Sequence, residues 1–117
     1  MAKDALVSED LASKFATEKE TPYTRWVKNE GLDIISAHYV RNLNTVDLKP
    51  WARRGGKGVY INHEASRTSN DCYVVEIAPG KQLEPQRQIF EEMIYVLSGR
   101  GSTTVWNDQG HRITFEW

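Results

Sequence analysis

PGKQLEPQRQIFEEMIYVLSGRG, residues 79–101, is the stretch whose spacing decides the fold of this 117-residue chain. It places Gln86, Gln88 and Glu92 between two glycines. Residues separated by one position lie on the same face of an extended strand, so both glutamines can point the same way. Glu92 follows after a turn, begins the next strand and can face the same point. The spacing therefore predicts a polar site shared by two neighbouring strands.

The rest of the chain from residue 34 onward also has the pattern of strands. In CYVVEIAPG (72–80), apolar residues alternate so that Tyr73, Val75 and Ile77 share one face. The other predicted strands lie within residues 34–40, 59–62, 92–98, 101–106 and 111–117, and NDQG (107–110) predicts the turn before the last of them. Short strands separated by turns favour an antiparallel barrel or sandwich.

A longer spacing includes the two glycines. It runs Gly80, five residues, Gln86, one residue, Gln88, three residues, Glu92, six residues, Gly99. This is the spacing of the first cupin motif, in which histidines normally occupy the places of the two glutamines. With WARRGGKGVYI (51–61) and GSTTVW (101–106), it makes residues 22–117 resemble bacterial single-domain members of the cupin superfamily.

The resemblance implies a mainly β fold: a cupin-like jelly-roll (double-stranded β-helix) barrel in residues 34–117, after a helical extension in residues 1–33. The chain ends at Trp117, about where the second cupin motif begins, so the barrel would be incomplete or completed by a second chain. Open strand edges and apolar faces favour pairing with another chain. We therefore expect a homodimer, with strand exchange as one form of it. The alternative is a fragment of a longer parent.

The metal site that the resemblance implies is degenerate in this chain. Cupins bind a transition metal through the histidines and glutamate of the first motif and a later histidine. The amide oxygens of Gln86 and Gln88 are far weaker ligands than imidazole, which leaves Glu92 as the one full-strength ligand. We expect no cofactor, and if one binds, a weakly held divalent transition metal (Fe, Mn, Ni, Cu or Zn).

Four side chains are the expected ligand-binding set of the barrel interior: Gln86, Gln88, Glu92 and Tyr95. Two interpretations of the glutamines stay open: they bind a small polar ligand, or they only hydrogen-bond Glu92 and Arg87. The expected function is that of a non-catalytic small-molecule-binding or interaction protein acting as an oligomer. The alternative is a metal-dependent cupin enzyme of the dioxygenase, isomerase or decarboxylase type, with an atypical or inter-chain metal site and unassigned catalytic residues.

The first third of the chain predicts helices. Ser8 is a candidate cap for a helix over residues 9–18. TPYTRWVKNEG (21–31) is the firmer signal, with threonine as N-cap, proline at the first helical position and Gly31 closing the end. The side chains that we expect this second helix to bury are Trp26 and Val27.

Composition excludes several classes of function. The formal net charge of -1 provides no bulk attraction to nucleic acid or to an anionic membrane. No apolar run approaches the ~20 residues of a membrane span, and acidic residues interrupt the start of the chain, so we expect a cytoplasmic protein. The single cysteine, Cys72, is expected to be a small buried residue. WARRGGKG (51–58) lacks the spacing of a nucleotide-binding loop and is interpreted as a surface turn.

Overall fold

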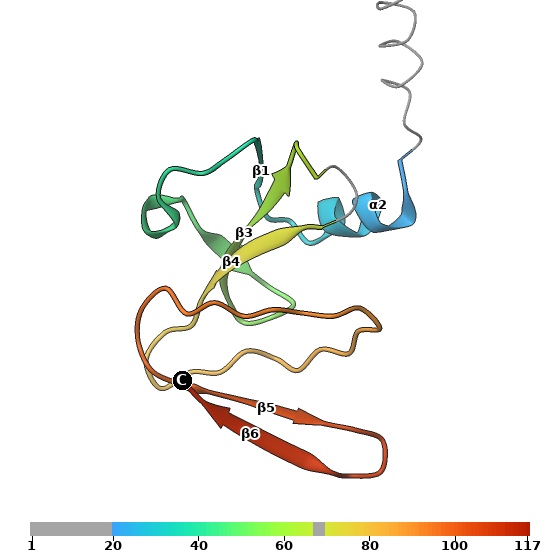
Figure 1. The fold of residues 1–117 in the computed structure, drawn as a ribbon, viewed down its shortest axis with the longest axis vertical. Helices are drawn as coiled ribbons and strands as arrows, with labels where there is room; N and C mark the ends of the chain where they lie inside the picture. The colour runs from blue at the N-terminus through green and yellow to red at the C-terminus, as the bar shows by residue number, and fades with distance from the viewer. Residues whose placement is uncertain (1–19, 67–69) are drawn as a thin grey trace, which may run out of the picture.

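A computed structural model describes residues 20–66 and 70–117, and this part of the chain is mainly β (Figure 1). Its helix is α2 (Pro22–Asn29), and a single 3-10 turn, η1 (Leu43–Thr45), precedes the second strand. The strands are β1 (Ile34–Ala37), β2 (Lys49–Trp51), β3 (Gly56–His63), β4 (Cys72–Glu76), β5 (Ser102–Trp106) and β6 (Arg112–Glu116). They form two separate sheets, and within the described residues these sheets do not close into a barrel. The helix expected over residues 9–18 lies outside the described residues.

Helix α2 begins and ends where the sequence predicts. The Thr21 hydroxyl accepts a hydrogen bond from the backbone N–H of Thr24 at 3.1 Å, and proline occupies the first turn. Gly31 follows the end of the helix with φ of +73°, a conformation that glycine adopts without a steric penalty. Local sequence signals therefore determine both ends of this helix.

The prediction of what α2 buries is half right. Val27 is buried and belongs to the same apolar cluster as Leu32, just after the helix. Trp26, expected to be buried as well, is 40% exposed. A helix of two turns presents one narrow stripe to a sheet, and Val27 occupies that stripe, so Trp26 lies at its edge. Its ring there packs against Tyr60 at 6.3 Å between centroids.

Strand β3 is the centre of the first sheet. One edge pairs antiparallel with β4 along Lys57–Ile61. The other edge is shared, because β2 pairs antiparallel with its first half and β1 pairs parallel with its second half. Four consecutive residues, Gly58 to Ile61, are buried, as is typical of a strand covered on both faces.

An aromatic cluster forms the core on the α2 side of this sheet. Trp51, 1% exposed, meets Tyr60 and Tyr73 edge-on, with ring centroids 5.6 and 5.4 Å away. Gly58 makes room for it, since a Cβ at that position would lie 2.9 Å from Cε3 of Trp51. Trp51 is the last residue of β2, and the predicted surface turn follows it at residues 52–55, none of which is buried.

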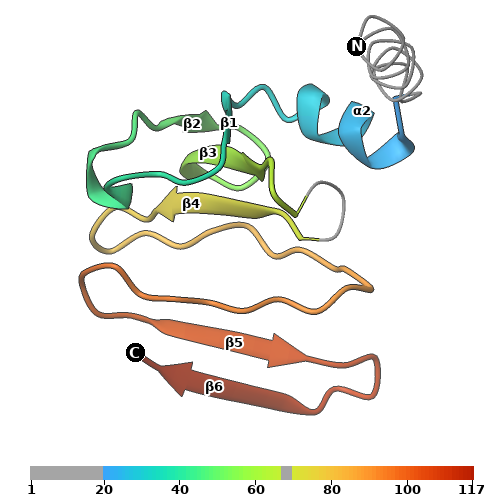
Figure 2. The same cartoon turned by 45° about the horizontal axis from the view of Figure 1, so that its top comes forward.

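Residues 77–101 connect the two sheets and contain no strand. The strand expected over residues 92–98 is therefore wrong for this structure. Figure 2 shows the connection running out and back between β4 and β5 as two extended passes. Extended conformation becomes a strand only when a neighbouring backbone accepts and donates its hydrogen bonds, which propensity alone does not provide. Ile94 and Tyr95 are accordingly exposed.

The second sheet is the β5–β6 hairpin, closed by the turn predicted at residues 107–110. The Asn107 side chain accepts hydrogen bonds from the backbone N–H groups of Gln109 and His111, at 3.0 and 3.1 Å. The register pairs Val105 with Ile113, so one face of the hairpin is apolar, and its side chains are exposed. The structure thus leaves an apolar sheet face without a covering layer among the described residues.

None of the helices in the described residues has the length and apolar character needed to cross a membrane. Cys72 differs from its expected burial: it is exposed, at the first residue of β4. The expectation failed because the start of an outer strand is covered less than its middle. Cys72 keeps one weak contact, from Sγ to the carbonyl oxygen of Ile61 at 3.7 Å.

Candidate functional site

Tyr73 is the side chain around which the candidate site is built. Strand β4 sets it directly opposite Tyr60 of β3, and the two rings meet edge-on with centroids 5.9 Å apart. The partly buried ring leaves the hydroxyl at the margin of the core, where it donates a hydrogen bond to the Glu92 carboxylate. Tyr73 thus presents its polar end to residues 79–101, the first-motif segment.

The two glutamines lie together on that segment. The Gln86 amide nitrogen donates to the Gln88 side-chain oxygen at 2.8 Å, which requires both side chains on one face, as their spacing predicts. The segment is tied to the β2–β3 turn just before them. The backbone N–H of Glu84 donates to the Arg54 carbonyl at 2.7 Å, and the Arg54 guanidinium donates to the Glu84 carbonyl.

The structure brings Gln86, Gln88 and Glu92 to one region and leaves Tyr95 out of it. The Gln86 amide lies close enough to the Tyr73 hydroxyl to influence its pKa, and Glu92 accepts from the same hydroxyl. Tyr95 is 84% exposed on the return pass. Arg87 does not bond the glutamines but forms a two-point ion pair with Asp108, at 2.9 and 3.0 Å.

An open groove of about 570 Å³ lies next to the glutamines. Helix α2 and the β2–β3 turn form one wall, and the first-motif segment forms the other. The residues that line it are Tyr23, Trp26, Arg53, Pro85, Gln86, Arg87, Gln88, Ile89 and Phe90. Amide, guanidinium and aromatic groups therefore face one space, which suits a small molecule with both a polar and an apolar part.

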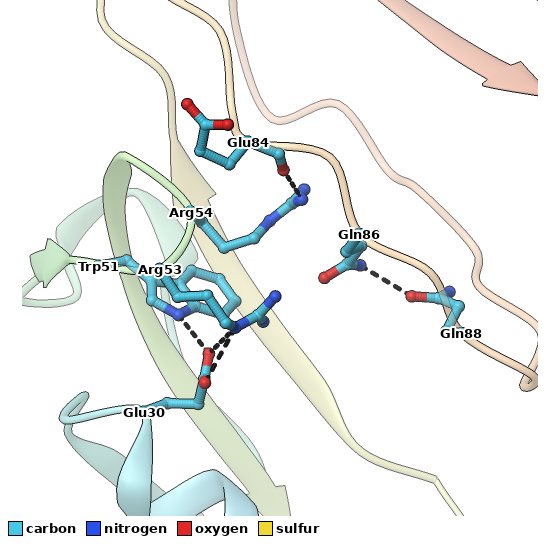
Figure 3. A network of polar contacts seen from close by, with 7 residues as sticks. All are labelled: Glu30, Trp51, Arg53, Arg54, Glu84, Gln86 and Gln88. Carbon is cyan, nitrogen blue, oxygen red and sulfur yellow. Dashed lines mark hydrogen bonds and ion pairs between the residues drawn. The ribbon is translucent and has the colours of Figure 1, made fainter.

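A second polar cluster, missed from sequence, lies beside this groove and reaches it through Arg53 (Figure 3). Glu30, at the end of α2, accepts from the Trp51 indole N–H at 2.6 Å and from Arg53 Nε at 2.7 and 2.9 Å. The Arg53 guanidinium also lies 5.3 Å from the Trp26 ring centroid. No local signal indicates this cluster, because Glu30 lies 21 positions before Trp51 and 23 positions before Arg53.

The donor chemistry of the motif residues does not fit a tight transition-metal site. Gln86 and Gln88 offer neutral amides that already bond each other, and the Glu92 carboxylate is engaged by Tyr73. Residues 20–66 and 70–117 contain no cluster of three or more His, Cys, Asp or Glu side chains placed to hold a metal ion. His38 lies elsewhere, 3.2 Å from the Glu64 carboxylate on the surface.

Partly buried tyrosines make the stability of the fold sensitive to alkali. Burial, and then the hydrogen bond to Glu92, raises the pKa of Tyr73 from its ordinary value of 10.0 to about 12. Burial, and then Asp71, raises the pKa of Tyr23 to about 12. Each of these tyrosines therefore stays protonated to a higher pH in the folded chain than in the unfolded chain. Their contribution to stability is therefore complete below pH 10 and is lost as the pH rises toward 12.

We expect urea denaturation midpoints to fall steadily between pH 10 and pH 12 for this reason. The variant Tyr73→Phe should reduce that slope because it removes one of the groups that titrates late. Tyr95→Phe, at an exposed position, is the matched control for loss of a hydroxyl and should keep the wild-type slope. An unchanged slope in Tyr73→Phe would contradict the assignment of this pKa shift to Tyr73.

Comparison of the chain with protein-family models, with curated proteins and with solved structures finds no match.

Proposed function

We propose that this chain is a non-catalytic binding protein for a small polar molecule, built on a cupin-like β framework with a degenerate metal site and acting as an oligomer. The observation that carries the proposal is the meeting of Gln86, Gln88 and Glu92 at Tyr73, beside a groove of about 570 Å³. Where a cupin metal centre has imidazoles, this site has amides. Amides donate and accept hydrogen bonds and so can select a polar ligand directly.

Binding at this site should depend on the amide groups of Gln86 and Gln88 that do not already hydrogen-bond within the protein. Gln86 donates one N–H to Gln88, and the Gln88 amide nitrogen donates no hydrogen bond to a side chain of the described residues. A ligand that pairs with these groups gains their hydrogen bonds, and one that cannot pair with them leaves polar groups buried and unsatisfied. The arrangement therefore favours ligands that carry both donors and acceptors.

The oligomer part of the proposal rests on apolar surface. On the β5–β6 hairpin, Val105, Ile113 and Phe115 share one face and each is about half exposed. On the neighbouring return pass, Met93 and Ile94 are exposed as well. Monomeric proteins rarely leave the apolar face of a sheet uncovered, and a second copy that packs against it would remove it from water.

The test is a ligand-detected NMR screen of small polar molecules against the full chain and the double variant Gln86→Leu/Gln88→Leu. Hits that bind this site should bind the variant at least about tenfold more weakly, since it removes the amide hydrogen bonds. Gln82→Leu, at an exposed position that does not line the groove, is the matched control and should bind like the wild type.

Three results would contradict the proposal. The first is a screen in which no bound molecule depends on the two glutamines. The second is stoichiometric Fe, Mn, Ni, Cu or Zn in the purified protein, retained at the motif residues, because the site would then be a metal centre. The third concerns the oligomer alone. A light-scattering mass equal to that of one chain would refute the proposed oligomer without affecting the proposed binding site.

A further inference from the structure

We propose that Arg53 is the anion-binding group of the groove and that its ligand is a small carboxylate with a planar apolar body. The inference rests on the proposed function and adds the chemical class of the ligand. It uses Glu30, Trp51 and Arg53, which belong to the framework next to the first-motif residues rather than to the motif itself.

The guanidinium of Arg53 has one engaged side and one free side. Its Nε makes both contacts to the Glu30 carboxylate. Figure 3 shows the two terminal nitrogens pointing away from Glu30, toward the segment that carries Gln86 and Gln88. No side chain or carbonyl among the described residues accepts a hydrogen bond from these terminal nitrogens. Two parallel N–H groups in a plane are the partner that a carboxylate binds through both oxygens.

The orientation of this free edge is set before any ligand binds. The guanidinium lies 5.3 Å from the Trp26 ring centroid and 5.6 Å from that of Trp51. Its Glu30 partner is 7% exposed in its side chain and is itself held by the Trp51 indole N–H. An arginine fixed in this way loses little rotamer freedom when it binds, so less of the binding free energy is spent on ordering it.

The remaining walls of the groove determine what the carboxylate is attached to. Tyr23 and Trp26 stack on each other with centroids 5.9 Å apart and are partly exposed, and Phe90 faces them from the first-motif segment. Flat apolar rings bind a flat apolar body. The amides of Gln86 and Gln88 lie between the two regions and can bond a further polar substituent.

The charges around the groove indicate how it would distinguish one anionic ligand from another. The positive charge of Arg53 is already balanced by Glu30, and that of Arg87 by Asp108. A general attraction for anions is therefore weak at this groove. The preference for a carboxylate comes instead from the two directed hydrogen bonds to Arg53, so an anion without an apolar body should bind weakly.

The experiment titrates the full chain with 3-phenylpropanoate, with its neutral amide and with inorganic phosphate. Binding is followed in ¹H–¹⁵N spectra through the indole N–H signals of Trp26 and Trp51. We expect 3-phenylpropanoate to bind about tenfold or more tightly than its amide, the effect of a charge-assisted pair of hydrogen bonds. Phosphate should bind more weakly than 3-phenylpropanoate.

The variant Arg53→Lys keeps the charge and removes the planar pair of donors, so it should bind the carboxylate and the amide about equally. Arg87→Lys is the matched control, because Arg87 lines the same groove but its terminal N–H groups already bond Asp108. That control should retain the wild-type preference. If Arg53→Lys does not fold, the comparison of carboxylate with amide on the wild-type chain still decides the question.

Equal binding of carboxylate and amide to the wild-type chain would overturn the inference. An Arg53→Lys variant that still prefers the carboxylate to the amide would also overturn it. Phosphate binding as tight as that of 3-phenylpropanoate would show that the ligand does not need an apolar body. In each case a glutamine-dependent hit in the screen of polar molecules would leave the proposed function intact. Failure of both experiments would remove the site altogether.

Discussion

Trp51→Ala is expected to lower the free energy of unfolding by about 3–5 kcal/mol, the cost of removing a fully buried tryptophan from a core. Trp51 is 1% exposed and contacts the rings of Tyr60 and Tyr73. Its indole N–H also satisfies the buried Glu30 carboxylate at 2.6 Å, so truncation leaves both a cavity and a carboxylate with one fewer donor. A loss of this size is a large fraction of the stability of a small domain. The measurement is equilibrium urea denaturation.

The matched control for this change is Trp106→Ala. Trp106 is 52% exposed on the β5–β6 hairpin, where its ring meets the Arg112 guanidinium at 5.5 Å. Loss of a half-exposed ring and one exposed cation–π contact should cost about 1 kcal/mol. Equal effects of the two substitutions would show that the aromatic cluster on the first sheet is not the stabilising core.

Glu30→Ala is expected to lower the free energy of unfolding by about 2–3 kcal/mol. The side chain of Glu30 is 7% exposed and accepts from both Trp51 and Arg53. Its removal leaves a buried indole N–H without an acceptor. Arg53 is 37% exposed, so water compensates part of the lost ion pair, which places the effect below that of a fully buried pair.

Glu20→Ala is the control for a carboxylate of the same type. Glu20 bonds Lys28 at 2.8 Å, but both side chains lie at the surface, where ion pairs are screened by water. The denaturation midpoint of this variant should not shift measurably. A large shift in Glu20→Ala, or no shift in Glu30→Ala, would contradict the assignment of Glu30 as the polar group that joins α2 to the sheet.

The sequence predictions are accurate where they depend on interactions between residues close together in the chain, and fail where they depend on distant ones. Helix α2 was predicted correctly because Thr21, Pro22 and Gly31 act within a few residues. The hairpin turn at residues 107–110 was predicted for the same reason, since Asn107 bonds its own neighbours. Residues 92–98 have equally strong β propensity, yet no strand forms there, because a strand needs a partner backbone that local sequence does not specify.

The same distinction between local and long-range interactions applies to the candidate site. The period of an extended chain places Gln86 and Gln88 on one face, and the structure has them 2.8 Å apart. The meeting of Glu92 with Tyr73 joins residues 19 positions apart, and that of Glu30 with Arg53 joins residues 23 positions apart. No spacing rule reaches across such distances, so both contacts had to come from the packed structure.

The sequence by itself determined that the chain is mainly β and where α2 and the hairpin turn lie. Only the tertiary structure decided that Trp51 is core, that Trp26 and Cys72 are not, and that Arg53 faces the glutamines. The physical reason is that backbone conformation and side-chain periodicity are local. Burial and the pairing of charges depend on which distant segments share a surface, and only the folded chain establishes that.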